Sequence, residues 1–352
     1  MGANQFRVVA GLSLKNLNPR VWDASSPHYL PELTGLMVSY AEFHRSPAQR
    51  RKAMTFGLRA FLGAPPGVVI YLDNGAFYFL ARSGDGHVEA YEEFVREARP
   101  DWHPIPQDII PTPSMSDQEQ RDCLLQTASN NARYASGPHI PIIHVSRVMA
   151  EAIAALQAMP GICAKSGIGV GGIVPNLLRM PKAMAYRDVL QAVARARTAF
   201  PAKQLHLFGV GGTATLHLAT LLGMDSADSS GWRNRAARGL IQLPGTGDRL
   251  VADLGRWRGR EPSPDEWARI EACECPGCRI GGVAGLRASG RDGFRQRAVH
   301  NLWVLLQEAE LIRMHLANGT YEDWFRAHLD NTIYLPLIEE TLRSHLPRHG
   351  RQ

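Results

Sequence analysis

Three cysteines and a histidine in the last quarter of the chain have the types and spacing of a metal site. Cys273, Cys275 and Cys278 lie within six residues, and His300 follows on a segment with helical periodicity. Thiolates this close in sequence can converge on one tetrahedral ion while a helix supplies the histidine, which predicts a closed, structural Zn²⁺ site. Two alternatives remain open: a reduced cluster without metal, and His315, further along the same segment, as the fourth ligand.

Three aspartates lie at the ends of apolar, strand-like segments. Asp73 ends Val-Val-Ile-Tyr-Leu-Asp, Asp108 ends Pro-Ile-Pro-Gln-Asp, and Asp228 ends Gly-Met-Asp-Ser-Ala-Asp. In a barrel of parallel strands, the carboxyl ends of the strands meet around one mouth, where such enzymes place their catalytic groups. We therefore predict that these carboxyl groups surround one substrate. Taken singly, each aspartate is more simply explained as a helix N-cap or a loop acid, so the prediction rests on their shared placement.

Two glycine-rich turns follow strand-like segments and precede helical ones. They are Gly-Ile-Gly-Val-Gly-Gly-Ile over 167–173 and Gly-Val-Gly-Gly over 209–212. Such turns let backbone N–H groups approach a flat ligand or a phosphate without interference from a Cβ atom. Neither turn matches the dinucleotide fingerprint with its later ribose-binding acid, so a nicotinamide cofactor is weakly supported. Ordinary barrel turns are the alternative interpretation.

The segments that must position these residues alternate between short apolar strands and longer helical patterns, which is typical of repeated βα units and a parallel sheet. The predicted strands are 35–40, 68–73, 105–110, 140–145, 167–173, 205–210, 224–228 and 240–243. Eight strands with intervening helices predict an α/β fold, a closed (β/α)8 TIM barrel. An open, doubly wound sheet is the alternative, because strand counts from one sequence are imprecise.

The character of the sequence changes after the barrel pattern. Residues 253–274 are rich in Arg, Trp, Pro and acids and lead into the cysteine cluster, and helical patterns follow at 296–317 and 335–346. We therefore predict three parts. They are a catalytic barrel region over 1–250, a zinc-binding subdomain over 251–318, and a C-terminal helical segment over 319–352 that packs on the barrel.

Composition limits the class of protein. The 352 residues are 45% hydrophobic, enough for a large core, and no apolar run is long enough to cross a bilayer. Residues 1–14 lack the pattern of an export signal, so we predict a cytoplasmic location and no membrane partner.

Between Arg233 and Arg297 there are 13 arginines against 8 acidic residues. This bias favours a polyanionic partner, although a solvated basic face explains it equally well.

In combination, these motifs resemble the tRNA-guanine transglycosylases and, more closely, their relatives that insert 7-deazaguanine bases into DNA. The matching segments run in order along nearly the whole chain. They are Asp73-Asn-Gly-Ala-Phe77 for the family's Asp-Ser-Gly-Gly-aromatic turn, Gln107-Asp108 for its base-binding acid, Gly171-Gly172-Ile173 for its Gly-Gly-Leu, His206-Leu-Phe-Gly-Val-Gly211 for its Tyr-Leu-Met-Gly-Val-Gly, Gly223-Met-Asp-Ser-Ala-Asp228 for its nucleophile strand, and the cysteine cluster with His300-Asn-Leu302. Any one match is weak, but six in register are specific.

The resemblance implies a base exchange through a covalent intermediate. Asp228 would attack the anomeric carbon of a guanosine unit and expel guanine, and a 7-deazaguanine such as preQ0 would then displace Asp228 with net retention of configuration. Asp73 would be the general acid and base. The implied base-binding residues are Asp108, His144, Gly171, Gly172 and Ile173, with Phe77 and Phe208 on the two faces of the ring. A target base inside a duplex must first leave the stack.

One departure from the family pattern concerns the base. The chain has Ile142-Ile-His144 where the family usually has Gln at the end of the fourth strand, so one hydrogen-bond partner of the base changes. A buried structural role explains His144 equally well.

A second departure concerns the nucleic acid. The run 229–239 replaces the Pro-Thr-Arg loop with which the tRNA enzymes contact the anticodon. We interpret its Trp232, Arg233, Arg235 and Arg238 as nucleic-acid contacts and expect DNA rather than tRNA as the substrate. A tRNA substrate and a non-catalytic nucleic-acid-binding paralogue are the alternatives, and the presence of both Asp73 and Asp228 argues against the second. A homodimer or a helper protein are further expected partners.

Overall fold

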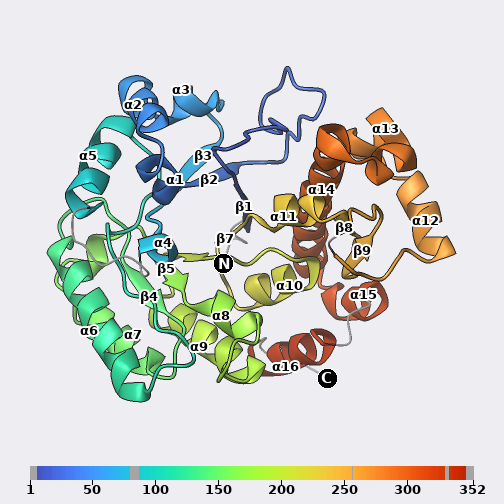
Figure 1. Cartoon of the computed structure of the whole chain (residues 1–352). Helices are drawn as coiled ribbons and strands as arrows, with labels where there is room; N and C mark the ends of the chain where they lie inside the picture. The colour runs from blue at the N-terminus through green and yellow to red at the C-terminus, as the bar shows by residue number, and fades with distance from the viewer. Residues whose placement is uncertain (1–5, 80–86, 256, 330–332, 346–352) are drawn as a thin grey trace.

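The computed structural model describes residues 6–79, 87–255, 257–329 and 333–345. Within these ranges, seven strands form one curled parallel sheet in the order β3-β2-β1-β7-β6-β5-β4, and β8 and β9 form a separate antiparallel pair (Figure 1). The strands are β1 (Arg7–Gly11), β2 (Gly35–Ser39), β3 (Val69–Asp73), β4 (Ile142–His144), β5 (Gly167–Gly171), β6 (Gln204–Leu207), β7 (Ser226–Ser229), β8 (Leu240–Gln242) and β9 (Asp248–Leu250). This is a TIM-barrel-like α/β fold, as the alternation in the sequence predicts.

Helices surround the outer face of the sheet and form most of the C-terminal part (Figure 1). The described helices are α1 (Tyr40–His44), α2 (Pro47–Phe56), α3 (Leu58–Leu62), α4 (Ala76–Phe79), α5 (Val88–Ala98), α6 (Asp117–Arg133), α7 (Met149–Gln157), the 3₁₀ turn η2 (Ile162–Ala164), α8 (Ile173–Leu177), α9 (Tyr186–Ala199), α10 (Thr213–Leu221), α11 (Gly231–Ala237), α12 (Pro264–Glu271), α13 (Pro276–Arg287), α14 (Gly290–Ala317), α15 (Tyr321–His328) and α16 (Leu335–His345). None of the helices in these described ranges combines the length and apolar character needed to cross a membrane.

A short extended segment lies between the two edge strands of the sheet. Trp102 bridges Tyr71 of β3, and Pro104 bridges Ile140 next to β4, in both cases in parallel. The amide of Ile105 donates to the carbonyl of Ile140 at 3.1 Å. The segment occupies the place of an eighth strand, but proline has no N–H to contribute to a ladder, so no regular strand forms here.

Two of the predicted barrel strands are not part of the parallel sheet, so these two predictions are wrong. Residues 240–243 form β8, which pairs with β9 and lies outside the parallel sheet, and residues 105–110 form no strand in the described structure. The seventh parallel strand is instead β1, between β2 and β7, which the sequence interpretation misses. It escapes a search for βα units because no helix follows it: the chain reaches β2 through turns and loops over 12–34.

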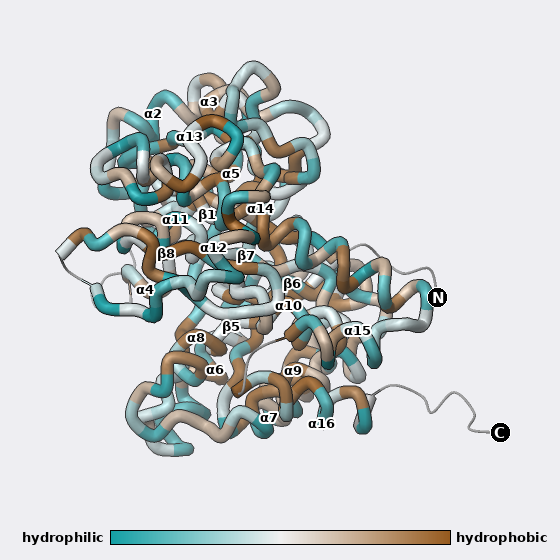
Figure 2. Tube along the Cα trace, turned by 90° about the vertical axis from the view of Figure 1, so that its right-hand side faces the viewer, coloured by the Kyte–Doolittle hydropathy of each residue, from teal (hydrophilic) through white to brown (hydrophobic). Residues whose placement is uncertain are grey.

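The cysteine-bearing region has a small apolar cluster of its own. Ile241 and Leu243 around β8 pack with Ile270 of α12 and Leu286 of α13, separately from the main core. This cluster begins before residue 251, where we expected the subdomain to start. Along α14 hydrophobic and hydrophilic segments alternate (Figure 2), and the helix contacts α13, β8, α10 and α11. The middle of α14 is buried on all sides, so the helix packs between the small region and the barrel.

Candidate active site and metal centre

A pocket of about 490 Å³ opens at the carboxyl ends of the parallel strands. Most of the predicted site residues line it, namely Asp73, Phe77, Asp108, His144, Gly171, Gly172, Phe208 and Asp228. Ile173, the remaining predicted base contact, is buried and does not line the pocket. Residues predicted from six separate segments of sequence thus meet around one cavity, because these segments lie at the same edge of the sheet.

Asp73 ends β3 and lies on a tight turn. Its Oδ2 accepts a hydrogen bond from the Gly75 amide at 3.1 Å. Gly75 has a φ of 83°, and a Cβ atom there would lie 2.7 Å from the Cβ of Ala41, so only glycine fits this turn. Burial, with the negative charges of Asp228 and Asp108 nearby, raises the pKa of Asp73 to about 7. This carboxyl group can therefore hold and release a proton near neutral pH.

Asp228 lies on β7 and lines the same pocket. Its side chain is 14% exposed. Its Oδ1 accepts a hydrogen bond from the Gly209 amide at 2.8 Å. The Nε2 atom of His206 lies 3.4 Å from the same oxygen. The carboxylate is thus oriented from the end of β6 and open to the pocket, the placement that a nucleophile requires.

Asp108 is held by two other side chains in a nearly fully buried group. Asn74 donates through Nδ2 to Asp108 Oδ1 at 2.6 Å and to the Ile105 carbonyl at 2.9 Å. His144 Nε2 lies 2.8 Å from Asp108 Oδ2. Each carboxylate oxygen keeps a further lone pair with which it can accept hydrogen bonds from a ligand. His144 fits both interpretations given above. It is buried, as a structural histidine would be, and it pairs with Asp108, the expected base-binding acid, on the pocket wall.

Two aromatic rings lie on the pocket wall. Phe77 on α4 is 59% exposed. Phe208, directly after β6, packs edge-on against His206 at a centroid distance of 4.8 Å. An exposed ring beside a pocket is suited to stack on a flat ligand.

Two of the four predicted nucleic-acid contacts are not on the surface. Trp232 is fully buried, and its indole N–H donates to the Gly11 carbonyl at 3.0 Å. Arg233 is buried as well and donates to the carbonyls of Asn18 and Asn16. Burial lowers the pKa of Arg233 to about 10. Both side chains hold the loop that follows β1 and are turned away from the surface, and their role as nucleic-acid contacts stays a prediction.

The other two arginines lie along a second cavity of about 640 Å³ that shares Gly209 and Asp228 with the first. Arg235 donates through Nε to Asp248 at 2.7 Å. Arg238 is exposed, and its guanidinium lies 4.0 Å from the centroid of the Trp257 ring. These two residues, unlike Trp232 and Arg233, border a groove that leads away from Asp228.

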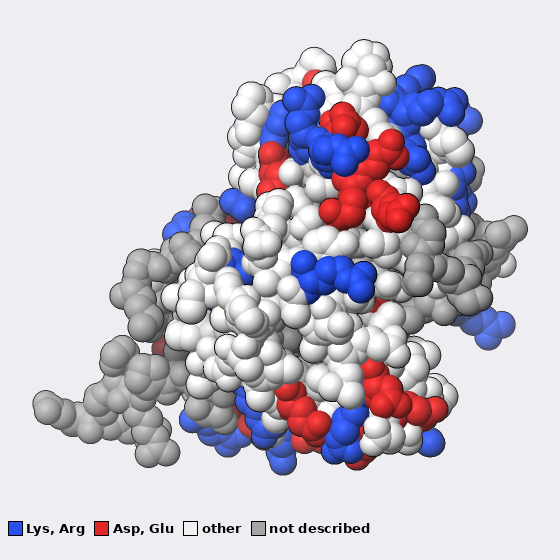
Figure 3. Space-filling view, turned by 90° about the vertical axis from the view of Figure 1, so that its left-hand side faces the viewer, with Lys and Arg blue, Asp and Glu red and all other residues white. Residues whose placement is uncertain are grey.

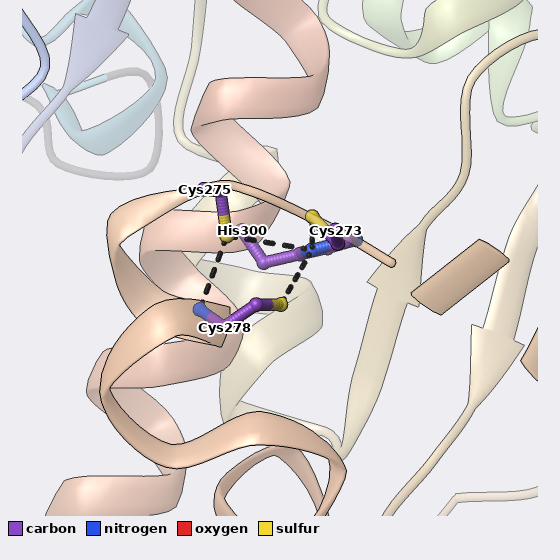
Figure 4. A group of neighbouring side chains, drawn as sticks. All are labelled: Cys273, Cys275, Cys278 and His300. Carbon is purple, nitrogen blue, oxygen red and sulfur yellow. Dashed lines mark hydrogen bonds between the residues drawn. The ribbon is translucent and has the colours of Figure 1, made fainter. Parts of the chain in front are cut away.

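The predicted metal ligands come together at the junction of α13 and α14 (Figure 4). The Nδ1 atom of His300 lies 3.5, 3.7 and 3.4 Å from the sulfurs of Cys273, Cys275 and Cys278. His300 Nε2 lies 2.9 Å from the Gln242 carbonyl oxygen, a contact that leaves the Nδ1 lone pair facing the sulfurs. Four converging donors of this kind fit a tetrahedral metal ion.

His315, the alternative fourth ligand, lies outside this cluster. Its Nδ1 is 2.8 Å from Thr320 Oγ1, and its ring stacks on Trp324 at 4.3 Å. The Cys3His set with His300 is therefore the one that the fold assembles.

Sequence reasoning missed three residues that shape the site. Asn74 holds Asp108, Ser39 hydrogen-bonds Asp73, and His206 approaches Asp228. The alternation of a strand could have indicated His206. Leu205 and Leu207 pack in the main core outside the barrel, so His206 between them must point inward.

Comparison with known proteins agrees with this geometry. The family model described as Queuine tRNA-ribosyltransferase matches residues 147–332. A tRNA-guanine(15) transglycosylase of Methanopyrus kandleri is 28% identical over 289 residues, which are 77% of this chain and 55% of that protein. The corresponding protein of Thermococcus kodakarensis is 24% identical over 319 residues, 86% of this chain and 47% of that protein.

A third relative, the tRNA-guanine(15) transglycosylase of Pyrococcus abyssi, is 29% identical over 178 residues, half of this chain and a quarter of that protein. The chain thus spans between a quarter and about half the length of these curated relatives. The family match covers the strand that carries Asp228 and all four residues of the Cys3His cluster. The chain belongs to the Queuine tRNA-ribosyltransferase family.

Proposed function

We propose that this protein is a guanine transglycosylase that replaces a guanine base in tRNA with a 7-deazaguanine. The observation that carries the proposal is the meeting of Asp73, Asp108 and Asp228 around one pocket in a chain of this family. The names of the relatives support tRNA as the substrate. Our expectation of DNA rested on the run 229–239, and the burial of Trp232 and Arg233 removes half of that argument.

The proposed reaction has two displacement steps. Asp228 attacks the anomeric carbon of the target nucleoside while Asp73, in its protonated form, donates its proton to the leaving guanine. The incoming base then loses a proton to the Asp73 carboxylate and displaces Asp228 from the same carbon. Two inversions give net retention of configuration. A pKa near 7 suits Asp73 to both roles, because neither protonation state is costly at neutral pH.

Recognition of the base involves the part of the pocket wall around Asp108 and Gly172. We assign the hydrogen bonds of the guanine edge to Asp108, held by Asn74 and His144, and to the backbone around Gly172. Since Ile173 lies behind this wall, its contribution is limited to its backbone carbonyl. Phe77 and Phe208 are the proposed stacking partners of the base.

The nucleic acid must approach from the mouth of the barrel. On the side of the molecule formed by α2, α5, α6 and α7, basic and acidic side chains lie interspersed, and no continuous positive patch is visible (Figure 3). The groove beside Asp228, with Arg235 and Arg238, is instead open to the reacting centre. We assign the phosphates that flank the target nucleotide to this groove.

For the Cys3His cluster we propose a structural Zn²⁺ ion. Four protein ligands close the coordination sphere, so the ion would have no position for a substrate. When bound, zinc would tie α13 to α14 and take no part in the base exchange.

The proposal is tested by incubating the protein with radiolabelled guanine and either tRNA or duplex DNA. We expect label in tRNA, none in DNA, and no exchange with Asp228→Ala, while Asp122→Asn, an exposed acid on α6, retains full activity. Label in DNA alone would restore our original expectation of a DNA substrate. Binding of tRNA without exchange would identify a non-catalytic paralogue.

A further inference from the structure

We infer that His206 is a positioning residue for Asp228, and that together with the Gly209 amide it fixes Oδ1 and leaves Oδ2 as the attacking atom. This inference rests on the proposed function and deepens it. It follows from the distinct surroundings of the two carboxylate oxygens. Oδ1 accepts from the Gly209 amide at 2.8 Å and lies 3.4 Å from His206 Nε2, whereas Oδ2 has no hydrogen-bond partner within the described residues.

The His206 ring is locked in place. It is 2% exposed, and the rings of Tyr71, Trp102 and Phe208 surround it at centroid distances of 5.2, 5.1 and 4.8 Å. On its far edge, Nδ1 lies 2.9 Å from the hydroxyl oxygen of Ser226. Packing of this kind holds the ring in one orientation, with Nε2 directed at the Asp228 carboxylate.

The contact with Asp228 selects the tautomer. The Ser226 hydroxyl can donate to Nδ1 or accept from it, whereas an ionised carboxylate oxygen only accepts. With the proton on Nε2 the ring presents a donor to Asp228, and the opposite tautomer would place the Nε2 lone pair against a carboxylate oxygen. Within the described residues Nε2 makes no hydrogen bond, and Asp228 Oδ1 lies 3.4 Å away. Since an unsatisfied buried N–H is costly, Asp228 Oδ1 is the acceptor that this proton requires.

Arg7, which donates through Nη1 to the Tyr71 hydroxyl at 3.1 Å, lies behind the ring that covers His206. The groups that face His206 are thus the Asp228 carboxylate on one side and Tyr71 with Arg7 on the other.

This arrangement assigns the atoms of the first step. The Oδ2 atom of Asp228 forms the bond to the anomeric carbon as the bond from that carbon to the guanine nitrogen breaks. The electron pair leaves with guanine, which takes the proton of Asp73. Asp228 becomes an uncharged ester, and Oδ1 becomes its carbonyl oxygen.

The second step returns the charge to Asp228. As the incoming base bonds to the anomeric carbon, the bond to Oδ2 breaks and the proton of the base goes to Asp73. The negative charge reappears on the carboxylate, where the donors of Gly209 and His206 stabilise it. Donors fixed in advance at developing negative charge lower the barrier without reorganisation.

The test compares His206→Phe, which keeps a ring but no donor, with His206→Gln, whose amide nitrogen can take the place of Nε2. The readout is the rate at which a covalent tRNA adduct forms in a single turnover. We expect His206→Phe to slow adduct formation by about 10- to 100-fold with an unchanged KM for tRNA, because Oδ2 is no longer held toward the anomeric carbon, and His206→Gln to recover most of the rate.

Three outcomes would overturn the inference: a wild-type rate in His206→Phe, no recovery in His206→Gln, or a loss expressed in KM rather than in the rate. If His206→Phe does not fold, Ser226→Ala decides, because without the hydroxyl Nδ1 loses its partner, the ring is less firmly held with Nε2 toward Asp228, and the rate must fall. His315→Phe, on the outer surface of α14, is the matched control. A wild-type protein that forms no adduct would instead refute the proposed function itself.

Discussion

The surroundings of Asp73 disfavour the negatively charged form of its carboxyl group. Burial, and then the charges of Asp228 and Asp108, raise the pKa of its carboxyl group from 3.8 to about 7. The same surroundings that make it a proton donor at neutral pH therefore make its ionised form unfavourable in the folded state. Such opposition between activity and stability is common in active sites.

Asp73→Asn should stabilise the protein at high pH. The folded state binds the Asp73 proton more tightly than the unfolded state does, so this group contributes stability below about pH 4 and loses it as the pH rises to about 7. At pH 8 the wild type carries the full penalty, which the neutral amide avoids. We expect a gain on the order of 1 to 3 kcal/mol in the free energy of unfolding, and loss of exchange activity.

Denaturant unfolding at pH 8 and pH 4 measures this effect. The gain should be present at pH 8 and disappear at pH 4, where both side chains are uncharged. Asp122→Asn on the exposed face of α6 should change neither value. An Asp73→Asn variant that is no more stable than the wild type at pH 8 would show that the carboxyl group is not buried among like charges.

The ends of the predicted strands indicated the acidic residues of the candidate site, but no pattern in the sequence indicated the residues that support them. Asp73 and Asp228 follow apolar runs that the sequence displays directly. Asn74 and His206 act through partners from distant segments, Asp108 and Asp228 respectively, and no local pattern shows such pairs. Trp232 shows the same limit. An indole beside arginines resembles a nucleic-acid contact, and its burial depends on the distant Gly11 carbonyl.

At the scale of elements, the six correctly predicted parallel strands are each followed by a helix, whereas residues 105–110 form no strand although α6 follows them. Residues 240–242 have the apolar character of a barrel strand, and only their pairing with β9 removes them from the sheet. β1 has equally suitable residues, yet it lacks the helix that defines a βα unit. Strand propensity is local, whereas pairing is decided by long-range contacts.

We expect the stability of the junction between α13 and α14 to depend on a bound Zn²⁺ ion. Elemental analysis is expected to give one zinc per chain, and Cys275→Ser to lose that zinc with a large fall in melting temperature. The reason is that a closed site contributes its binding energy to folding, on the order of 10 kcal/mol in small zinc domains. Cys163→Ser, at an exposed cysteine away from the cluster, is the control and should retain full metal. Full zinc and stability in Cys275→Ser would refute the structural role.

At the scale of the molecule, α14 joins the metal centre to the reacting centre. His300 and Asn301 are neighbours on this helix. The Asn301 side chain accepts from the Gln242 amide at 2.7 Å and donates to the Trp232 carbonyl at 3.1 Å. Trp232 lies on α11, directly after the strand that carries Asp228. The Cys3His cluster thus supports, through one helix, the segment that follows Asp228 and borders the Arg238 groove.

If that groove holds flanking phosphates, Arg238 contributes to binding and not to chemistry. Arg238→Ala should raise the KM for tRNA while the rate at saturating tRNA stays close to that of the wild type, because the guanidinium is exposed and distant from the proton transfers. Each lost phosphate contact should reduce the slope of log affinity against log salt by about 0.7 to 0.9. Titration of tRNA at several salt concentrations measures both effects. Arg96→Ala, on the mixed-charge side covered by α5, should leave the slope unchanged, and an equal slope for Arg238→Ala would place the nucleic acid elsewhere.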